Sequence, residues 1–216
     1  MASKNLTDRF QEAFKDPESA HAQEYQKIVE AITNKISNDV EKSLLLLVGF
    51  IIMFVLIIEK QIGSIKFENI ELTDFSVIAI LIPLVFSYTH FNLITCISKF
   101  DQLSILYKII VKQRHKPIYD QRLTEFFLIT PNLYDYKYFS SNKPIQVVQF
   151  ILWAIQFFSV TIVIPFAFQG YAFANLFALY KPNHFALIVM SLAITVVFGL
   201  QSFLTVITLL RETTGK

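Results

Sequence analysis

The sequence predicts an all-α fold: a four-helix transmembrane bundle with an N-terminal amphipathic helix and a mostly helical cytoplasmic lobe between the second and third spans. The first observation is composition, because the 216 residues are 54% hydrophobic and only 17% charged, against about 25% charged residues in an ordinary soluble domain. The second is the presence of uncharged apolar stretches close to the roughly 20 residues that cross a hydrocarbon core. There are four of them: residues 43–58, 75–97, 145–168 and 185–210.

Residues 1–42 are charged and lack an apolar core near their start, so we expect no signal peptide. Leu6, Phe10 and Phe14 predict a short amphipathic helix, and Asp16-Pro17 is typical of the start of a second helix. The second helix carries apolar residues at three- and four-residue steps, which predicts that it continues into the first span. These residues are Tyr25, Ile28, Val29, Ile32, Ile36 and Val40. Such a stripe predicts a docking surface for a second copy, for the lobe or for lipid.

Basic residues alternate along the chain and predict its orientation. Lys and Arg number six in residues 1–42, two in 59–74, eight in 98–144, one in 169–184 and two in 211–216. Cytoplasmic segments are enriched in positive charge. We therefore expect a multi-pass plasma (inner) membrane protein with a cytoplasmic N terminus, lobe and C-terminal tail.

The loops between the spans differ in length. In the lobe, residues 98–144, apolar residues at helical spacing extend the second span, and an aromatic segment follows that is a candidate for docking a soluble partner. That segment contains Tyr134, Tyr136, Tyr138 and Phe139. In the outer loop 59–74, the stretch K-F-E-N-I-E-L predicts a strand or hairpin. The outer loop 169–184 is apolar enough to lie in the membrane interface.

Polar residues within the second span fall on two faces. Tyr88, Asn92 and Thr95 lie on one helical stripe with Lys99, while His90 lies on nearly the opposite side. One interpretation is a polar lining of a pore vestibule or cleft, with His90 as a pH-sensitive group. The other is hydrogen bonding between helices, in which His90 is neutral.

The third and fourth spans carry polar faces as well. Gln149 and Gln156 share a face with Gln146 and Trp153, and amides in lipid require protein or water partners. In a symmetric oligomer these glutamines would form rings that line a path or join subunits. The fourth span places four polar residues on one stripe that suits close helix packing; they are His184, Ser191, Thr195 and Ser202. Pro83 and Pro165 are expected to kink their helices.

Enzymatic classes find little support in the sequence. The chain lacks the short motifs of zinc proteases, serine hydrolases and P-loop enzymes, and all 17 carboxylates lie outside the four apolar stretches. We therefore expect no enzyme activity, no metal and no cofactor. Positive charge beside a membrane span is explained by the orientation of the chain, and the basic stretch 108–117 lies in such a position. Nucleotide binding is therefore not expected.

With spans running in order from residues 43–58 to 185–210, a cytoplasmic lobe and both termini inside, the chain resembles small four-span membrane subunits of bacterial anti-phage defence systems, of the Kiwa membrane component type. The resemblance implies a homo-oligomer that senses membrane disturbance and engages a cytoplasmic effector. Our leading hypothesis is accordingly a non-enzymatic, oligomeric inner-membrane sensor or scaffold that docks a soluble cytoplasmic protein.

An alternative hypothesis is a homo-oligomeric ion channel or pore-forming effector. Its path would be lined by polar, uncharged side chains, since a stack of amide and hydroxyl rings can accommodate water without fixed charge. The candidate residues are Gln149, Gln156, Asn92, Thr95, Tyr88, Ser191 and Thr195.

Overall fold

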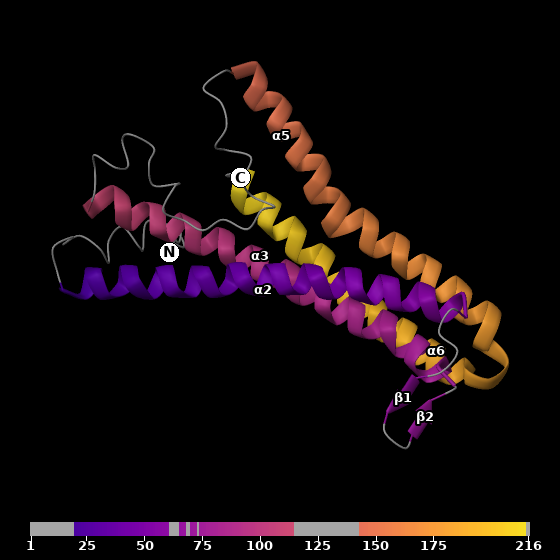
Figure 1. Ribbon diagram of the computed structural model, residues 1–216. Helices are drawn as coiled ribbons and strands as arrows, with labels where there is room; N and C mark the ends of the chain where they lie inside the picture. The colour runs from indigo at the N-terminus through magenta and orange to yellow at the C-terminus, as the bar shows by residue number, and fades with distance from the viewer. Residues whose placement is uncertain (1–19, 61–64, 68–69, 73, 115–142, 215–216) are drawn as a thin grey trace, which may run out of the picture. The chain divides into compact units, whose positions relative to one another are not determined.

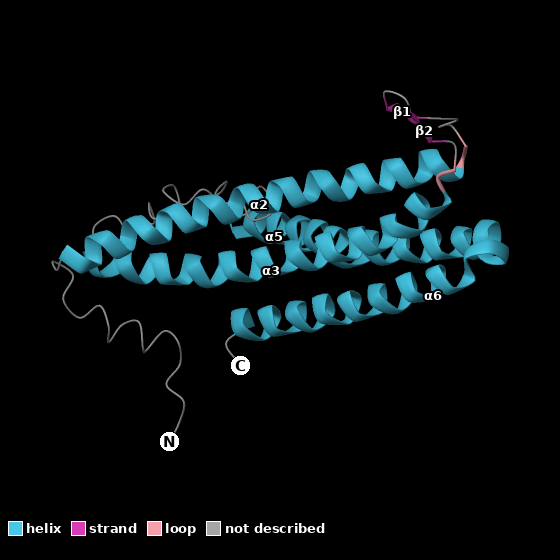
Figure 2. Cartoon of the chain, turned by 90° about the horizontal axis from the view of Figure 1, so that it is seen from below, coloured by secondary structure: helices cyan, strands magenta, loops and turns pink. Residues whose placement is uncertain are grey.

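The computed structural model describes residues 20–60, 65–67, 70–72, 74–114 and 143–214 (Figures 1 and 2). These residues are helical apart from one short hairpin and a few connecting residues. The helices are α2 (Ala20–Ile58), α3 (Ser76–Arg114), α5 (Lys143–Phe158), the π-helix η3 (Ser159–Val163) and α6 (Ile164–Thr214). The predicted helix of residues 1–15 and the central part of the predicted lobe lie outside the described residues.

Within the described residues, four helical segments are long and apolar enough to cross a membrane. They are Glu24–Ile58, Ser76–Lys112, Ala154–Tyr180 and Asn183–Thr208. The predicted all-α fold with four membrane-length helices is therefore confirmed, and the chain has the composition of a multi-pass membrane protein. The continuous helix through the first span is also confirmed, because α2 runs unbroken for 39 residues.

The chain divides into two compact units. Unit 1 comprises residues 1–41 and 96–153, and unit 2 comprises residues 42–95 and 154–216. Helices α2 and α3 each contribute one part to unit 1 and the other to unit 2.

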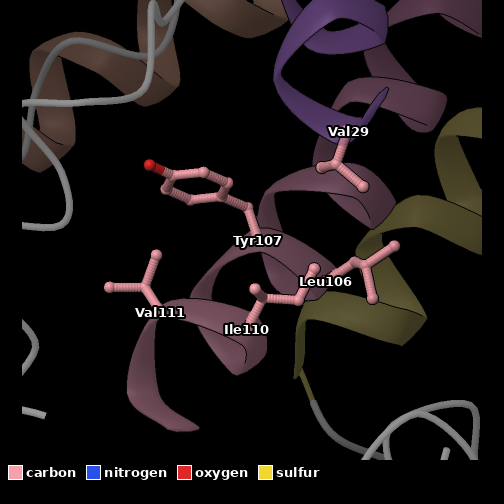
Figure 3. Close-up of a cluster of buried hydrophobic side chains, with 5 residues drawn as sticks. All are labelled: Val29, Leu106, Tyr107, Ile110 and Val111. Atoms are coloured by element: carbon pink, nitrogen blue, oxygen red, sulfur yellow. The ribbon is translucent and has the colours of Figure 1, made fainter. Parts of the chain in front are cut away.

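Unit 1 is held by apolar packing between α2 and α3, together with a side-chain hydrogen bond between Glu30 and Tyr107. Val29 of α2 is buried together with four residues of α3 (Figure 3), and Leu103 packs against the group. The four are Leu106, Tyr107, Ile110 and Val111. The apolar stripe predicted on α2 is only partly covered, since Val29, Ile36 and Val40 are buried whereas Tyr25, Ile28 and Ile32 are 42–48% exposed.

Unit 2 has an aromatic core in which α2, α3 and α6 meet. The ring of Phe54 lies 5.6 Å from Phe168 and 6.2 Å from Tyr171, both in edge contact. Phe86 of α3 also contacts Phe168, at 4.5 Å between ring centroids. Because aromatic edge contacts add to the burial of large apolar surfaces, Phe168 is the centre of this core.

The strands β1 (Ile65–Phe67) and β2 (Ile70–Leu72) form an antiparallel hairpin, with Ile65 opposite Leu72 and Phe67 opposite Ile70. This confirms the hairpin expected in loop 59–74. After it, the carboxylate of Asp74 accepts a 2.9 Å hydrogen bond from the backbone N–H of Ser76, the first residue of α3. Hydrogen bonds from the backbone and the side chain of Ser76 lower the pKa of Asp74.

The outer loop predicted at residues 169–184 differs from the structure, which has helix there. Helix α6 continues through these residues and breaks only at His184, whose φ of −130° and ψ of 23° are not helical. The third membrane-length segment is accordingly Ala154–Tyr180, not 145–168. The physical reason is that residues 144–180 contain no charged side chain, so nothing in the composition fixes where a span of about 20 residues begins.

Candidate functional site

Two prolines organise the polar groups of unit 2. Proline has no backbone N–H, so the carbonyl four residues before it loses its helical hydrogen-bond donor. Pro83 lies inside α3, and Pro165 lies directly after the π-helix. In lipid, carbonyls freed in this way require partners from side chains or neighbouring helices.

The π-helix places one such carbonyl against α3. The backbone N–H of Ile164 donates to the carbonyl of Ser159, five residues back, and Pro165 cannot donate to the carbonyl of Thr161. Instead, Nε2 of His90 donates to that carbonyl at 2.8 Å. A carbonyl only accepts, so Nε2 of the ring carries a proton. His90 is 4% exposed and connects α3 to the π-helix.

A second group of bonds joins Gln169 of α6 to the region of Pro83. The amide nitrogen of Gln169 donates to the Pro83 carbonyl at 3.0 Å and to the Ser87 hydroxyl at 2.7 Å. The Ser87 hydroxyl in turn donates to the Pro83 carbonyl at 2.9 Å. Because both partners of the amide group are acceptors, the orientation of the Gln169 side chain is determined by its surroundings.

Two further bonds join α3 to α6 toward the start of α3. The Ser191 hydroxyl donates to the carbonyl of Ile80 at 3.0 Å. The Ser76 hydroxyl lies 3.1 Å from Nε2 of His184, the residue at which α6 breaks. Hydrogen bonds of this kind between membrane helices contribute about 0.6 kcal/mol on average.

Next to these bonds, unit 2 contains a pocket of about 560 Å³. Its volume lies within the range of roughly 300–1,000 Å³ typical of small-molecule sites. Aromatic and aliphatic side chains form most of its wall, among them Phe86, Pro165, Phe166, Phe173, Leu200 and Phe203. Its polar lining residues are Ser87, His90, Gln169 and Thr195.

Two polar atoms of this lining lack a hydrogen-bond partner. Oε1 of Gln169 and Oγ1 of Thr195 are both buried and unpaired. A buried polar atom without a partner costs about 1–3 kcal/mol. Thr195 is 6% exposed, and its hydroxyl does not make the bond to the carbonyl four residues back that helical threonines often form. Both atoms have less than 1 Å² of accessible surface, so they are covered by neighbouring atoms and do not face the interior of the pocket.

The chemistry of the pocket is that of binding. No Asp, Glu, Lys or Arg is among its lining residues as far as the structure describes them. Among the described residues, no three His, Cys, Asp or Glu side chains lie where they could hold a metal ion. The mostly apolar lining can therefore accommodate apolar chains.

The predicted site residues do not lie together: some line the pocket, and others lie on exposed faces of the helices. His90 and Thr195 line the pocket, and Ser191 is buried beside it. Tyr88 is 56% exposed and packs its ring against Phe198, on the face opposite His90. Of the remaining residues, Asn92 and Gln156 are exposed, and the half-buried Thr95 donates to the Phe91 carbonyl of its own helix.

Several predicted residues cannot be placed. The side chain of Gln149 and the aromatic segment Tyr134, Tyr136, Tyr138 and Phe139 lie outside what the structure describes. Sequence reasoning missed Gln169, because it assigned this residue to an outer loop. The signal that could have found it is its position inside an uncharged stretch that extends to Tyr180.

Comparisons of the chain with protein-family models, with curated proteins and with solved structures find no match.

Proposed function

We propose that the protein is a non-enzymatic membrane sensor and scaffold, whose input is the occupancy of the unit 2 pocket and whose output is the docking surface of unit 1. The observation that carries the proposal is the pocket of about 560 Å³, whose wall is mostly apolar. A molecule that binds one arrangement of the surrounding helices better than another stabilises that arrangement. Binding can therefore shift the equilibrium between two arrangements of the surrounding helices.

The helices of the pocket offer a physical route from input to output. His90 on α3 lines the pocket, and the same helix supplies Leu106, Tyr107 and Ile110 to the core of unit 1. In unit 1, the exposed side chains of Ile28 and Ile32 on α2 form an apolar surface suited to a soluble partner. We propose that this surface faces the cytoplasm, in agreement with the distribution of basic residues.

Exposed polar residues favour self-association of the membrane segments. Asn92 and Gln156 lie within membrane-length helices and are exposed in the single chain, where lipid would leave their amides unpaired. Contact with another copy would pair them. A homo-oligomer is therefore part of the proposal, and an ion channel with Asn92 and Gln156 along its path is the second candidate.

The sensor proposal can be tested by hydrogen–deuterium exchange of the full chain in lipid nanodiscs. Discs of dioleoylphosphatidylcholine would be compared with discs that also contain a lysophospholipid, which disturbs chain packing. We expect altered exchange in the unit 1 parts of α2 and α3, around Val29 and Ile110. Equal exchange of these amides in both bilayers would contradict the sensor function.

A matched pair of variants connects this response to the pocket. Gly170 lines the pocket, and an added Cβ would meet no atom within 4 Å, so Gly170→Phe is expected to fill the pocket without distorting the helix. Gly49 has the same free space but does not line the pocket. Gly170→Phe should abolish the change in exchange, and Gly49→Phe should keep it. A response that survives Gly170→Phe would contradict the assigned input.

A role in anti-phage defence, which the resemblance to anti-phage membrane subunits implies, can be tested separately. Expression of the chain, alone and with its genomic neighbours, should lower phage plaque counts if it acts in defence, and Gly170→Phe should restore them. Bilayer conductance that depends on Gln156 and is lost in Gln156→Leu would favour the channel instead.

A further inference from the structure

Two uncharged amide side chains lie on the exposed surface of unit 2, at membrane-length helices. Asn92 on α3 and Gln201 on α6 are exposed and lie in the segments Ser76–Lys112 and Asn183–Thr208. Both lie inside uncharged stretches, and Asn92 comes about 10 Å before Lys99 along α3 at 1.5 Å per residue. Neither side chain makes a hydrogen bond within the part of the chain that the structure describes. Because an unpaired amide is costly in hydrocarbon, each of the two requires a partner.

Contacts between α3 and the part of α6 from His184 onward place the two amides at the same level. Three contacts join these helices, in the same order along both. They are Ser76 with His184, Ile80 with Ser191, and Tyr88 with Phe198. The two helices therefore run in the same direction. Asn92 follows Tyr88 by four residues and Gln201 follows Phe198 by three, so each amide lies about one turn beyond the same aromatic contact.

A second copy of the chain offers the matching groups. Copies of one sequence insert in the same orientation, because their loops carry the same charges. Only residues at the same depth can then meet between copies, and Asn92 and Gln201 satisfy this condition. A carboxamide both donates and accepts hydrogen bonds, so Asn92 of one copy and Gln201 of the other are complementary without any charge. Around a twofold axis this contact is formed twice.

We propose that the exposed face of α3 and α6 at Asn92 and Gln201 is the interface of a twofold homodimer, in which Asn92 of each copy hydrogen-bonds to Gln201 of the other. Tyr88, 56% exposed with its ring against Phe198, supplies an aromatic surface to the same interface. This inference rests on the proposed function, because it names the surface through which the homo-oligomer forms.

Crosslinking of the full chain in nanodiscs tests the contact. In a Cys96→Ser background, which removes the one native cysteine, one copy carries Asn92→Cys and a differently tagged copy carries Gln201→Cys. A short bifunctional thiol reagent is used, because two extended amide side chains separate their backbones by more than a disulfide can bridge. We expect crosslinked dimers for this pair. Met190→Cys is the matched control on α6, since Met190 is 60% exposed but lies about 16 Å from the level of Gln201 at 1.5 Å per residue, and it should give none.

The dissociation constant of the dimer, measured by sedimentation in detergent micelles, tests the energetics. Asn92→Leu or Gln201→Leu removes the bond on both sides of the axis and should raise the dissociation constant about eightfold, or about threefold per bond. The double variant should raise it no further, because both changes remove the same bond. Asn175→Leu is the matched control, since the Asn175 amide already donates to the Tyr171 carbonyl of its own helix, and it should leave the dissociation constant unchanged.

The interface and the proposed function can fail separately. Unchanged association of both leucine variants, or additive losses in the double variant, would overturn the interface and leave an oligomer formed through another face. Crosslinks from Asn92→Cys to Gln156→Cys in place of Gln201→Cys would also overturn it, as expected for a ring around a channel. A chain that stays monomeric would overturn the interface and the oligomer together, whereas the exchange response of unit 1 tests the sensor function independently.

Discussion

Units 1 and 2 are built from parts of the same helices but are held together differently. In unit 1, α2 and α3 meet mainly through an apolar cluster around Val29 and Ile110, and a side-chain hydrogen bond joins Tyr107 of α3 to Glu30 of α2. In unit 2, side chains of one helix bond to the backbone of another, as His90 does to Thr161 and Ser191 to Ile80. Directed bonds between a side chain and a neighbouring backbone fix the position of one helix along the other.

The difference between the units indicates in which of them a bound molecule would most affect the packing of the helices. The directed bonds of unit 2 gather near Pro83 and Pro165, where the helical ladder is interrupted, and the pocket lies beside them. Our proposal places ligand binding in unit 2 and partner docking in unit 1. Four predictions test the contrast between the units, beginning with the largest effect.

Ile110→Ala should lower the free energy of unfolding by about 2–4 kcal/mol, because Ile110 is 1% exposed and its truncation leaves a cavity in the unit 1 cluster. Unfolding in mixed micelles, followed by circular dichroism, measures the loss. The matched control is Ile28→Ala in the same unit, since Ile28 is 45% exposed and should lose much less. Similar losses for both variants would show that the cluster does not stabilise unit 1.

His90→Ala should lower the free energy of unfolding by about 1–3 kcal/mol, because the buried Thr161 carbonyl loses its donor. Pro165→Ala restores a backbone N–H at the position that α-helical pairing would use. The double variant should therefore be less destabilised than the sum of the two single variants, as a double-mutant cycle would measure. Strict additivity would contradict the assigned role of His90.

Ser191→Ala should lower the free energy of unfolding by about 0.6 kcal/mol, the average for hydrogen bonds between membrane helices. Ser104→Ala is the matched change in unit 1, where the hydroxyl bonds only to the Phe100 carbonyl of its own helix. We expect a smaller loss there, measured by the same unfolding assay. A larger loss for Ser104→Ala than for Ser191→Ala would reverse the contrast between the units.

The smallest effect is expected at the exposed Asp74, whose pKa is lowered by hydrogen bonds from the backbone and side chain of Ser76, with a further lowering by His184. A carboxyl with a lowered pKa stabilises the folded state above its unfolded pKa, and this stabilisation is lost as the pH falls through the folded value. Asp74→Asn should therefore melt slightly below the parent chain near neutral pH, and the two curves should converge in acid. A difference that persists in acid would refute the charge-based explanation.

Much of the fold follows from local pattern. The apolar stretches predict four membrane-length helices, and K-F-E-N-I-E-L predicts the hairpin, because both depend on neighbouring residues alone. The opposite faces of the second span are also found, with His90 buried and Tyr88 and Asn92 exposed. Helical periodicity is sufficient for such assignments.

The site could be predicted only in part. His90 and Thr195 are recognisable in the sequence as polar residues in apolar helices. Whether each side chain has a hydrogen-bond partner depends on contacts between distant segments. The carbonyl that His90 contacts is available because of Pro165, a relation across 75 residues that no local pattern contains. Gln169 was missed because the uncharged stretch 144–180 exceeds the length of one span and sets no boundary.

The central claim is that a molecule from the bilayer occupies the unit 2 pocket, and photocrosslinking tests it most directly. A phosphatidylcholine with a diazirine in its acyl chain would be activated in nanodiscs with the full chain, and the labelled peptides identified by mass spectrometry. We predict labelling at Phe166 and Phe203, blocked by Gly170→Phe but not by Gly49→Phe. Labelling spread over lipid-exposed side chains such as Leu45, 74% exposed on α2, and unchanged by Gly170→Phe would contradict the claim.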